Sequence, residues 1–186
     1  KEITEAGIIW PLNRNLDKGE ETLASVDNNE PVLDEFKALY GRKDYRAIHK
    51  DRQKFKVVAL DPQLEEQYTQ AIEYVTTIEK MIEALDHFSG QDRTIGPCIA
   101  YEQLLDFLEK NPDYAKDNQI IEARHKLEND AHDFVRALSD AKDCEKRAEF
   151  GSALSNYYRA QCIYPKSRIS SEGADRVTKI IVNAKY

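Results

Sequence analysis

Apolar side chains recur at alternating steps of four and three residues, which is the spacing of a helix with one buried face. One such seam predicts a single long helix from about residue 64 to residue 88. Its positions are Leu64, Tyr68, Ala71, Val75, Ile78, Ile82 and Leu85. A second seam over about 117–148 predicts another long helix, or two nearly continuous helices with a break at 128–130. Its positions are Ile120, Leu127, Ala131, Phe134, Leu138, Ala141 and Ala148.

Shorter apolar stretches predict further helices between and around these two long ones. They cover about 31–40, 44–60, 99–108, 153–164 and 171–185. Gly41 is expected to end the first of them, and Phe150-Gly151 is expected to form a tight turn before residue 153. Pro62, Pro112 and Pro165 each follow a shorter helix, because a proline ring cannot continue the helical hydrogen-bond ladder. The order of long helix, turn, short helix and proline recurs with a period of about fifty residues.

These patterns predict an all-α fold of antiparallel helical hairpins, two of whose helices are unusually long. Seven glycines, six prolines and 33% charged residues fit long helices with solvated faces better than a sheet. Residues 1–30 are interpreted as a lead-in segment that packs Trp10 on the body of the protein. Residues 31–186 are interpreted as one helical domain, with pairs at about 31–62, 63–112 and 113–165 and a final helix at 171–185.

The helix that ends before Pro165 carries the most specific pattern. Ala153 and Ala160 lie seven residues apart and share a face with Tyr157, so another helix is expected to pack closely against that face. Residues 134–165 resemble a tetratricopeptide repeat (TPR), a family that pairs two antiparallel helices, and residues 150–165 match its second helix. At the positions of the family's first-helix pattern only the small residue Ala141 is kept. The resemblance implies a right-handed array of stacked hairpins, here with lengthened first helices.

As the resemblance implies, the chain is expected to be a non-catalytic protein–protein interaction module. A protein or peptide partner would lie on a concave surface lined by the first helix of each pair. In the third pair that surface would include Val135, Leu138, Lys142, Glu145 and Lys146. Lys142 and Lys146 would hold an acidic group or a C-terminal carboxylate of the partner, or would simply be solvated lysines. The alternative is a structural role, as a coiled-coil-like spacer or homodimerisation domain of a larger protein.

Charge and hydropathy narrow the range of partners. The net charge of −7 argues against a general nucleic-acid binder. The basic stretch at 42–56 is interpreted as a solvated helix face rather than a phosphate or nucleic-acid site, since its aromatic residues occupy core positions. No apolar run approaches the ~18 residues needed to span a membrane. Because the chain begins with Lys1, the sequence favours a soluble domain of an exported or cell-envelope protein, although the compartment stays open.

The sequence contains little that points to catalysis or to a cofactor. Glu122 and His125 have the Glu-x-x-His spacing of di-iron helical bundles, but the second such motif that this site needs does not occur. Nucleotide-binding, nucleophile-elbow and zinc-protease motifs do not occur either. Neither an enzyme nor a metal or other cofactor is therefore expected. Cys98, Cys144 and Cys162 are interpreted as buried small apolar residues, and a facing pair of Cys144 and Cys162 is the alternative.

Overall fold

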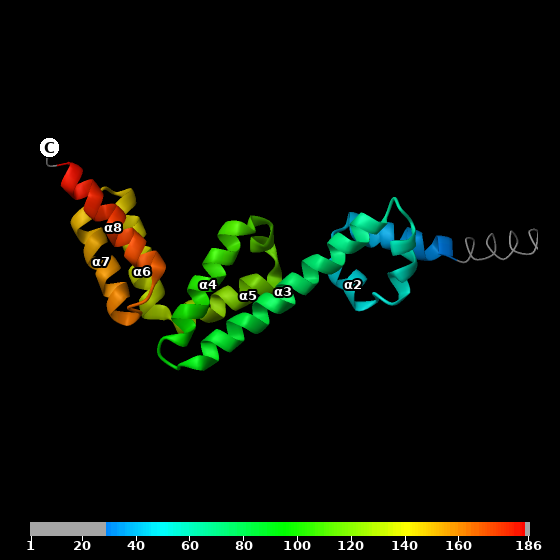
Figure 1. Cartoon of the computed structure of the whole chain (residues 1–186), viewed down its shortest axis with the longest axis horizontal. Helices are drawn as coiled ribbons and strands as arrows, with labels where there is room; N and C mark the ends of the chain where they lie inside the picture. The colour runs from blue at the N-terminus through cyan, green and yellow to red at the C-terminus, as the bar shows by residue number, and fades with distance from the viewer. Residues whose placement is uncertain (1–28, 185–186) are drawn as a thin grey trace, which may run out of the picture. The chain divides into compact units, whose positions relative to one another are not determined.

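The computed structural model describes residues 29–184, and this range is helical with no β-strand (Figure 1). The predicted all-α fold class is therefore confirmed. Contacts between Cα atoms divide the chain into two compact units, Lys1–Thr77 and Ile78–Tyr186. The boundary between these two units falls within the long helix α3 (Glu65–Gln91). The prediction of one helical domain over residues 31–186 stays a prediction. The lead-in interpretation, including the packing of Trp10, falls on residues outside the described range.

The first unit contains α1 (residues 29–41), α2 (Tyr45–Lys50), the 3₁₀ helix η1 (Lys54–Leu60) and the first part of α3. A single helix over 44–60 was the wrong prediction, because the chain turns at 51–53 and continues with 3₁₀ geometry. Phe55 and Val58 lie three residues apart on η1, which aligns them on one face of a 3₁₀ helix, and both are fully buried. The turn thus allows both halves of the segment to face the core.

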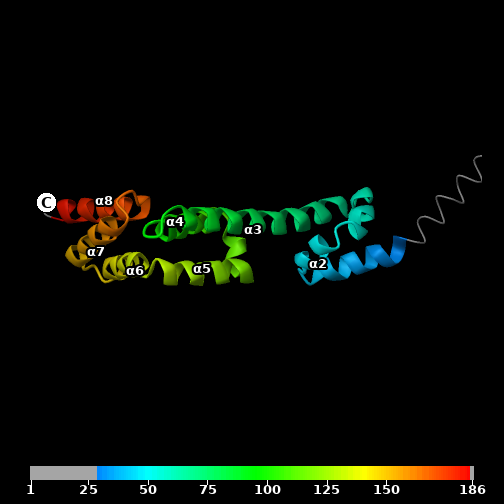
Figure 2. The same cartoon turned by 90° about the horizontal axis from the view of Figure 1, so that it is seen from below.

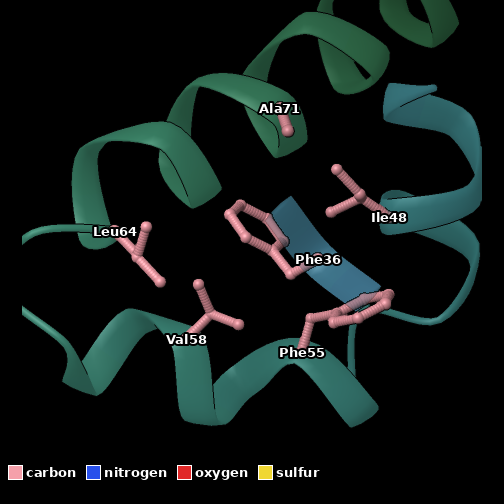
Figure 3. Close-up of a cluster of buried hydrophobic side chains, with 6 residues drawn as sticks. All are labelled: Phe36, Ile48, Phe55, Val58, Leu64 and Ala71. Carbon is pink, nitrogen blue, oxygen red and sulfur yellow. The ribbon is translucent and has the colours of Figure 1, made fainter. Parts of the chain in front are cut away.

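The core of the first unit centres on Phe36, as Figure 3 shows. The side chains of its buried cluster converge from α1, α2, η1, α3 and the turn before α3, and they are Phe36, Ile48, Phe55, Val58, Leu64 and Ala71. The rings of Phe36 and Phe55 have centroids 5.9 Å apart and are tilted by 59°, a favourable aromatic arrangement. The predicted apolar face of α1 and the start of the α3 seam therefore meet in one core.

Two helix ends use left-handed residues that are not glycine. Lys43 and Ala148 both have φ of 59°. At the second end, the amide of Ala148 donates to the carbonyl of Glu145 and that of Glu149 donates to Cys144, both at 2.9 Å. This nested pair of bonds is the Schellman motif, in which the left-handed residue satisfies the last helical carbonyls. Helix α1 ends at Gly41, as predicted, and the left-handed residue follows at Lys43. The prediction that Phe150-Gly151 forms the turn before α7 was wrong, since the reversal lies at Ala148 and these two residues begin α7.

The second unit contains the rest of α3, followed by six helical elements. These are α4 (Gly96–Lys110), η2 (Pro112–Lys116), α5 (Asn118–Asp130), α6 (His132–Lys146), α7 (Phe150–Ile163) and α8 (Arg168–Asn183). The long α3 is as predicted, and its seam residues Ala71, Val75, Ile78 and Leu85 are buried within the chain itself. The second seam forms two helices, and their break at Ala131 is next to the predicted position.

Helices α6, α7 and α8 pack together, with α7 contacting both of its neighbours (Figures 1 and 2). The predicted close face of α7 is confirmed, because Ala153, Tyr157 and Ala160 are all fully buried. Gly173 on α8 makes the approach still closer. A Cβ atom at Gly173 would stand only 2.4 Å from two ring carbons of Tyr157. The absence of a side chain at this position is therefore what lets α8 rest on the tyrosine ring.

A buried carboxylate joins α4 to the start of α8. Glu102 is 4% exposed, and its Oε1 accepts hydrogen bonds from the Ile169 amide at 2.6 Å and the Ser167 hydroxyl at 3.2 Å. Ser167 in turn caps α8 by accepting a bond from the Ser170 amide. Burial raises the pKa of Glu102 despite these donors. The final helix therefore starts at residue 168, three residues before the predicted start.

The three cysteines are free thiols. Cys98 and Cys144 are buried, as predicted, whereas Cys162 is exposed. Burial raises the pKa of Cys98 to about 11, so this thiol stays protonated at neutral pH. The expectation that all three are buried was wrong for Cys162, which lies on the outer face of α7.

Candidate functional site

A concave surface in the second unit is lined by side chains from several helices. It encloses about 520 Å³, and its walls come from α4, η2, α5, α6, α7 and α8. We call it the α4–α8 cavity. The lining residues are Leu105, Asp106, Leu108, Glu109, Ala115, Arg124, Lys142, Tyr157, Arg168, Ile169, Glu172 and Arg176. Leucine and isoleucine side chains supply apolar area, and charged groups from four helices surround them, which is the composition of a small binding site.

The three arginines of the α4–α8 cavity are each paired with a carboxylate. Arg124 Nε lies 2.8 Å from Glu128, and Arg176 Nη2 lies 2.8 Å from Glu145. Arg168 contacts Glu172 at 2.7 Å and also pairs with Asp106. These cations are held in place by their partners, so much of their charge is already compensated.

Lys142 differs from the arginines of the α4–α8 cavity. Its side chain is exposed and makes no ion pair or hydrogen bond with any residue in the range 29–184. It projects from α6, whose other basic side chain near this turn, Lys146, lies 3.0 Å from Asp143 on the same helix. The α4–α8 cavity therefore offers one uncompensated cation beside an apolar floor.

Tyr157 and Arg176, which both line the α4–α8 cavity, are joined by a hydrogen bond. The Arg176 guanidinium donates to the Tyr157 hydroxyl at 3.2 Å and to both carboxylate oxygens of Glu145, at 2.8 and 3.1 Å. Burial, followed by the nearby Glu145 charge, raises the pKa of Tyr157 to about 12. The hydroxyl is therefore protonated at neutral pH and acts as a structural hydrogen-bonding group, not as a base.

The structure separates the five residues that the sequence placed on a partner surface. Lys142 lines the α4–α8 cavity, and Glu145 forms an ion pair with Arg176, which also lines it. Val135 is half-buried, and Lys146 is exposed and paired within α6. Leu138 is only 3% exposed, so it belongs to the core and a partner cannot reach it. Of the five, Lys142 alone combines exposure, an open position in the cavity and an unmatched charge.

The Glu122 and His125 pair does not form a cluster of metal ligands. Both side chains are exposed, and the His125 ring lies 3.3 Å from Glu128. Across residues 29–184, no group of three or more His, Cys, Asp or Glu side chains is arranged to hold a metal ion. The spacing on one helix is therefore not complemented by ligands from a second helix, which such a site requires.

Sequence reasoning missed the contribution of α8 to the α4–α8 cavity. Arg168 and Arg176 lie eight residues apart, slightly more than two helical turns, so they project from a similar side of α8. That spacing was visible in the sequence. Their carboxylate partners were not, because Asp106 and Glu145 lie on other helices, 62 and 31 residues away in the chain.

Comparison of the chain with protein-family models, with curated proteins and with solved structures finds no match. Within the described range, no helix has both the length and the apolar character that crossing a bilayer would require.

Proposed function

We propose that this chain is a non-catalytic interaction module that binds an acidic segment of a peptide or protein partner in the α4–α8 cavity. The observation that carries the proposal is Lys142, an exposed cation without a counter-ion at a cavity whose arginines are all paired. A partner carboxylate would supply the missing counter-charge, and its neighbouring apolar side chains would cover the leucine and isoleucine floor.

The packing of α6, α7 and α8 supports the proposal. Residues 147–149 form a short connection, after which α7 packs along α6, and α8 then packs on α7. A TPR-like hairpin followed by a capping helix would have this order of contacts and would present the first helix of the pair to a partner. Lys142 lies on that first helix, α6.

The test uses a library of random synthetic peptides, each made with both a free C-terminal carboxylate and an amide. The wild-type protein is expected to select peptides rich in Asp and Glu. Their affinity, measured by fluorescence anisotropy, should fall by about tenfold or more in Lys142→Glu, because the variant places a like charge opposite the ligand.

Lys146→Glu is the matched control for this experiment. It makes the same change in net charge one turn away on the same helix, but at a lysine that Asp143 already pairs. We expect its affinity for the peptide to stay within about twofold of the wild type, since dissolved salt screens the interaction of the peptide with exposed charges outside the cavity. The proposal is wrong if no acidic peptide is selected, or if the two variants weaken binding equally. The difference between paired free-acid and amide peptides shows whether a terminal carboxylate is the preferred group.

A further inference from the structure

The segment from Lys43 to Leu60 in the first unit is strongly basic. Between residues 43 and 60 it holds six Lys and Arg against two Asp, in a chain whose net charge is −7. Four of these cations make no side-chain ion pair or hydrogen bond with another residue of the range 29–184, and they are Lys43, Lys50, Arg52 and Lys56. We call residues 43–60 the basic segment. No ion pair with a described residue compensates the charges of Lys43, Lys50, Arg52 and Lys56.

The basic segment also carries the most exposed large apolar side chain among the described residues. Leu60 is 81% exposed at the end of η1. The aromatic residue of η1, by contrast, is turned inward, because Phe55 is fully buried in the core that Figure 3 shows. Nucleic-acid binding surfaces commonly combine basic residues with exposed aromatic rings that stack on bases. An exposed leucine beside lysines favours a protein surface that is acidic and partly apolar.

The second unit contains a surface with the complementary composition. A groove of about 630 Å³ lies between α3 and α5. Ile82 and Ala123 contribute apolar area. The charged residues of the groove include Glu83, Asp86, Glu122 and Lys126. Lys126 contacts Asp86 at 3.2 Å, whereas Glu83 and Glu122 make no ion pair with a described residue. We call this surface the acidic groove.

We propose that the basic segment of one copy docks into the acidic groove of a second copy. The unpaired lysines would meet Glu83 and Glu122, and the exposed Leu60 would cover the apolar floor at Ile82 and Ala123. Each copy carries one basic segment and one acidic groove, and these are two different surfaces. The contact is therefore heterologous, so it builds rings or open chains of copies rather than a two-fold dimer. Association between exposed charges is expected to be weak and sensitive to salt.

The test is sedimentation velocity of the purified chain over a wide range of concentration. At ~0.01 M ionic strength, where the Debye length is about 30 Å, the sedimentation coefficient should rise with concentration. At ~1 M, where it is about 3 Å, the chain should be monomeric. Two charge-reversed variants, Lys50→Glu/Lys56→Glu and Glu83→Lys/Glu122→Lys, should each weaken association at low salt by about tenfold or more.

Mixing the two reversed variants distinguishes this contact from a general effect of net charge. In an equimolar mixture each basic surface again has an acidic surface to meet, so association should return. The chain that carries all four substitutions should also associate. Lys166→Glu/Lys179→Glu is the matched control for Lys50→Glu/Lys56→Glu, since it makes the same change in net charge at exposed lysines outside both surfaces. It should behave as wild type apart from a small uniform shift. Thermal unfolding followed by circular dichroism verifies that every variant is folded.

Three results would overturn the proposal. One is a wild-type chain that stays monomeric at low salt at every concentration. Another is a mixture of the reversed variants that associates no better than either variant alone. The third is a monomeric wild type whose acidic groove nevertheless binds an added oligolysine peptide, which would assign the groove to a different basic partner. None of these results depends on Lys142, so the proposed peptide-binding function is tested separately.

Discussion

Replacement of Gly173 by alanine is expected to destabilise the packed helices α6, α7 and α8, although the same change in a free helix is stabilising. In an exposed helix, Ala is better than Gly by about 1 kcal/mol. At Gly173, however, the new Cβ would lie 2.4 Å from two ring carbons of Tyr157 and 2.8 Å from a third. The ring cannot move away cheaply, because it is fully buried and its hydroxyl is bonded to Arg176.

The expected magnitude follows from the balance of these two effects. Overpacking a well-filled core costs about 1–3 kcal/mol, and a contact this short against a fixed ring belongs at the upper end of that range. After subtraction of the gain in helix propensity, the net loss of unfolding free energy is about 2 kcal/mol. The measurement is urea unfolding followed by circular dichroism. Hydrogen exchange of peptides from α7 and α8 accompanies it, so that any loss of stability is located in the unit that contains these helices.

Two further variants make the argument refutable. Gly151→Ala, in the first turn of α7, adds a Cβ that meets nothing within 4 Å, so it should gain about 0.5 kcal/mol. In a Tyr157→Leu background the clashing ring atoms are absent, and Gly173→Ala should then no longer cost stability. If Gly173→Ala stabilises the wild-type protein, or costs the same in both backgrounds, the close approach of α8 to Tyr157 is not what limits this position.

Two other predictions concern single positions of the fold. Ala148→Gly should raise the unfolding free energy by about 1 kcal/mol, because glycine adopts the φ of 59° without the steric penalty that alanine has. Urea titration measures this change. An unchanged or lower stability would contradict the explanation. Glu102→Ala should cost about 1–3 kcal/mol, because the Ile169 amide and the Ser167 hydroxyl lose their acceptor. Since burial raises the pKa of Glu102 in the folded state, its contribution to stability is fully present below the unfolded pKa of about 4.3 and is lost as pH rises through the folded pKa. Glu102→Gln should flatten that decline in pH-dependent unfolding, and a wild-type profile without it would refute the assignment.

The features that the sequence predicted correctly all depend on local periodicity. The helix α3 extends through residues 65–91 because its seam of apolar residues has no interruption by proline, and its single glycine, Gly90, lies in the last turn. The break between α5 and α6 was predicted within a residue of Ala131, next to Asn129 and Asp130, which have low helix propensity. The close face of α7 could be predicted because Ala153 and Ala160 mark it with small side chains.

The error in the predicted turn before α7 has a different physical origin. Glycine is the usual residue in the left-handed position of a helix end, which made Phe150-Gly151 a natural choice for this turn. The reversal is instead at Ala148, where the amides of Ala148 and Glu149 complete the Schellman bonds that satisfy the last carbonyls of α6. Alanine is a strong helix former, yet here it adopts a left-handed φ of 59°. No propensity rule that reads one residue at a time includes that choice.

The charges of the α4–α8 cavity illustrate a further limit of sequence reasoning. Lys142 and Lys146 are equivalent in the sequence, because they lie one turn apart on one helix with acidic residues nearby. In the fold, Lys146 pairs with Asp143 on the same helix, whereas Glu145, three residues after Lys142, pairs with Arg176 of α8. The carboxylate one turn from Lys142 is therefore taken up by an arginine that lies 31 residues away in the chain. For this reason Lys142→Glu is the variant that tests whether α6 presents a binding surface or only a solvated helix face.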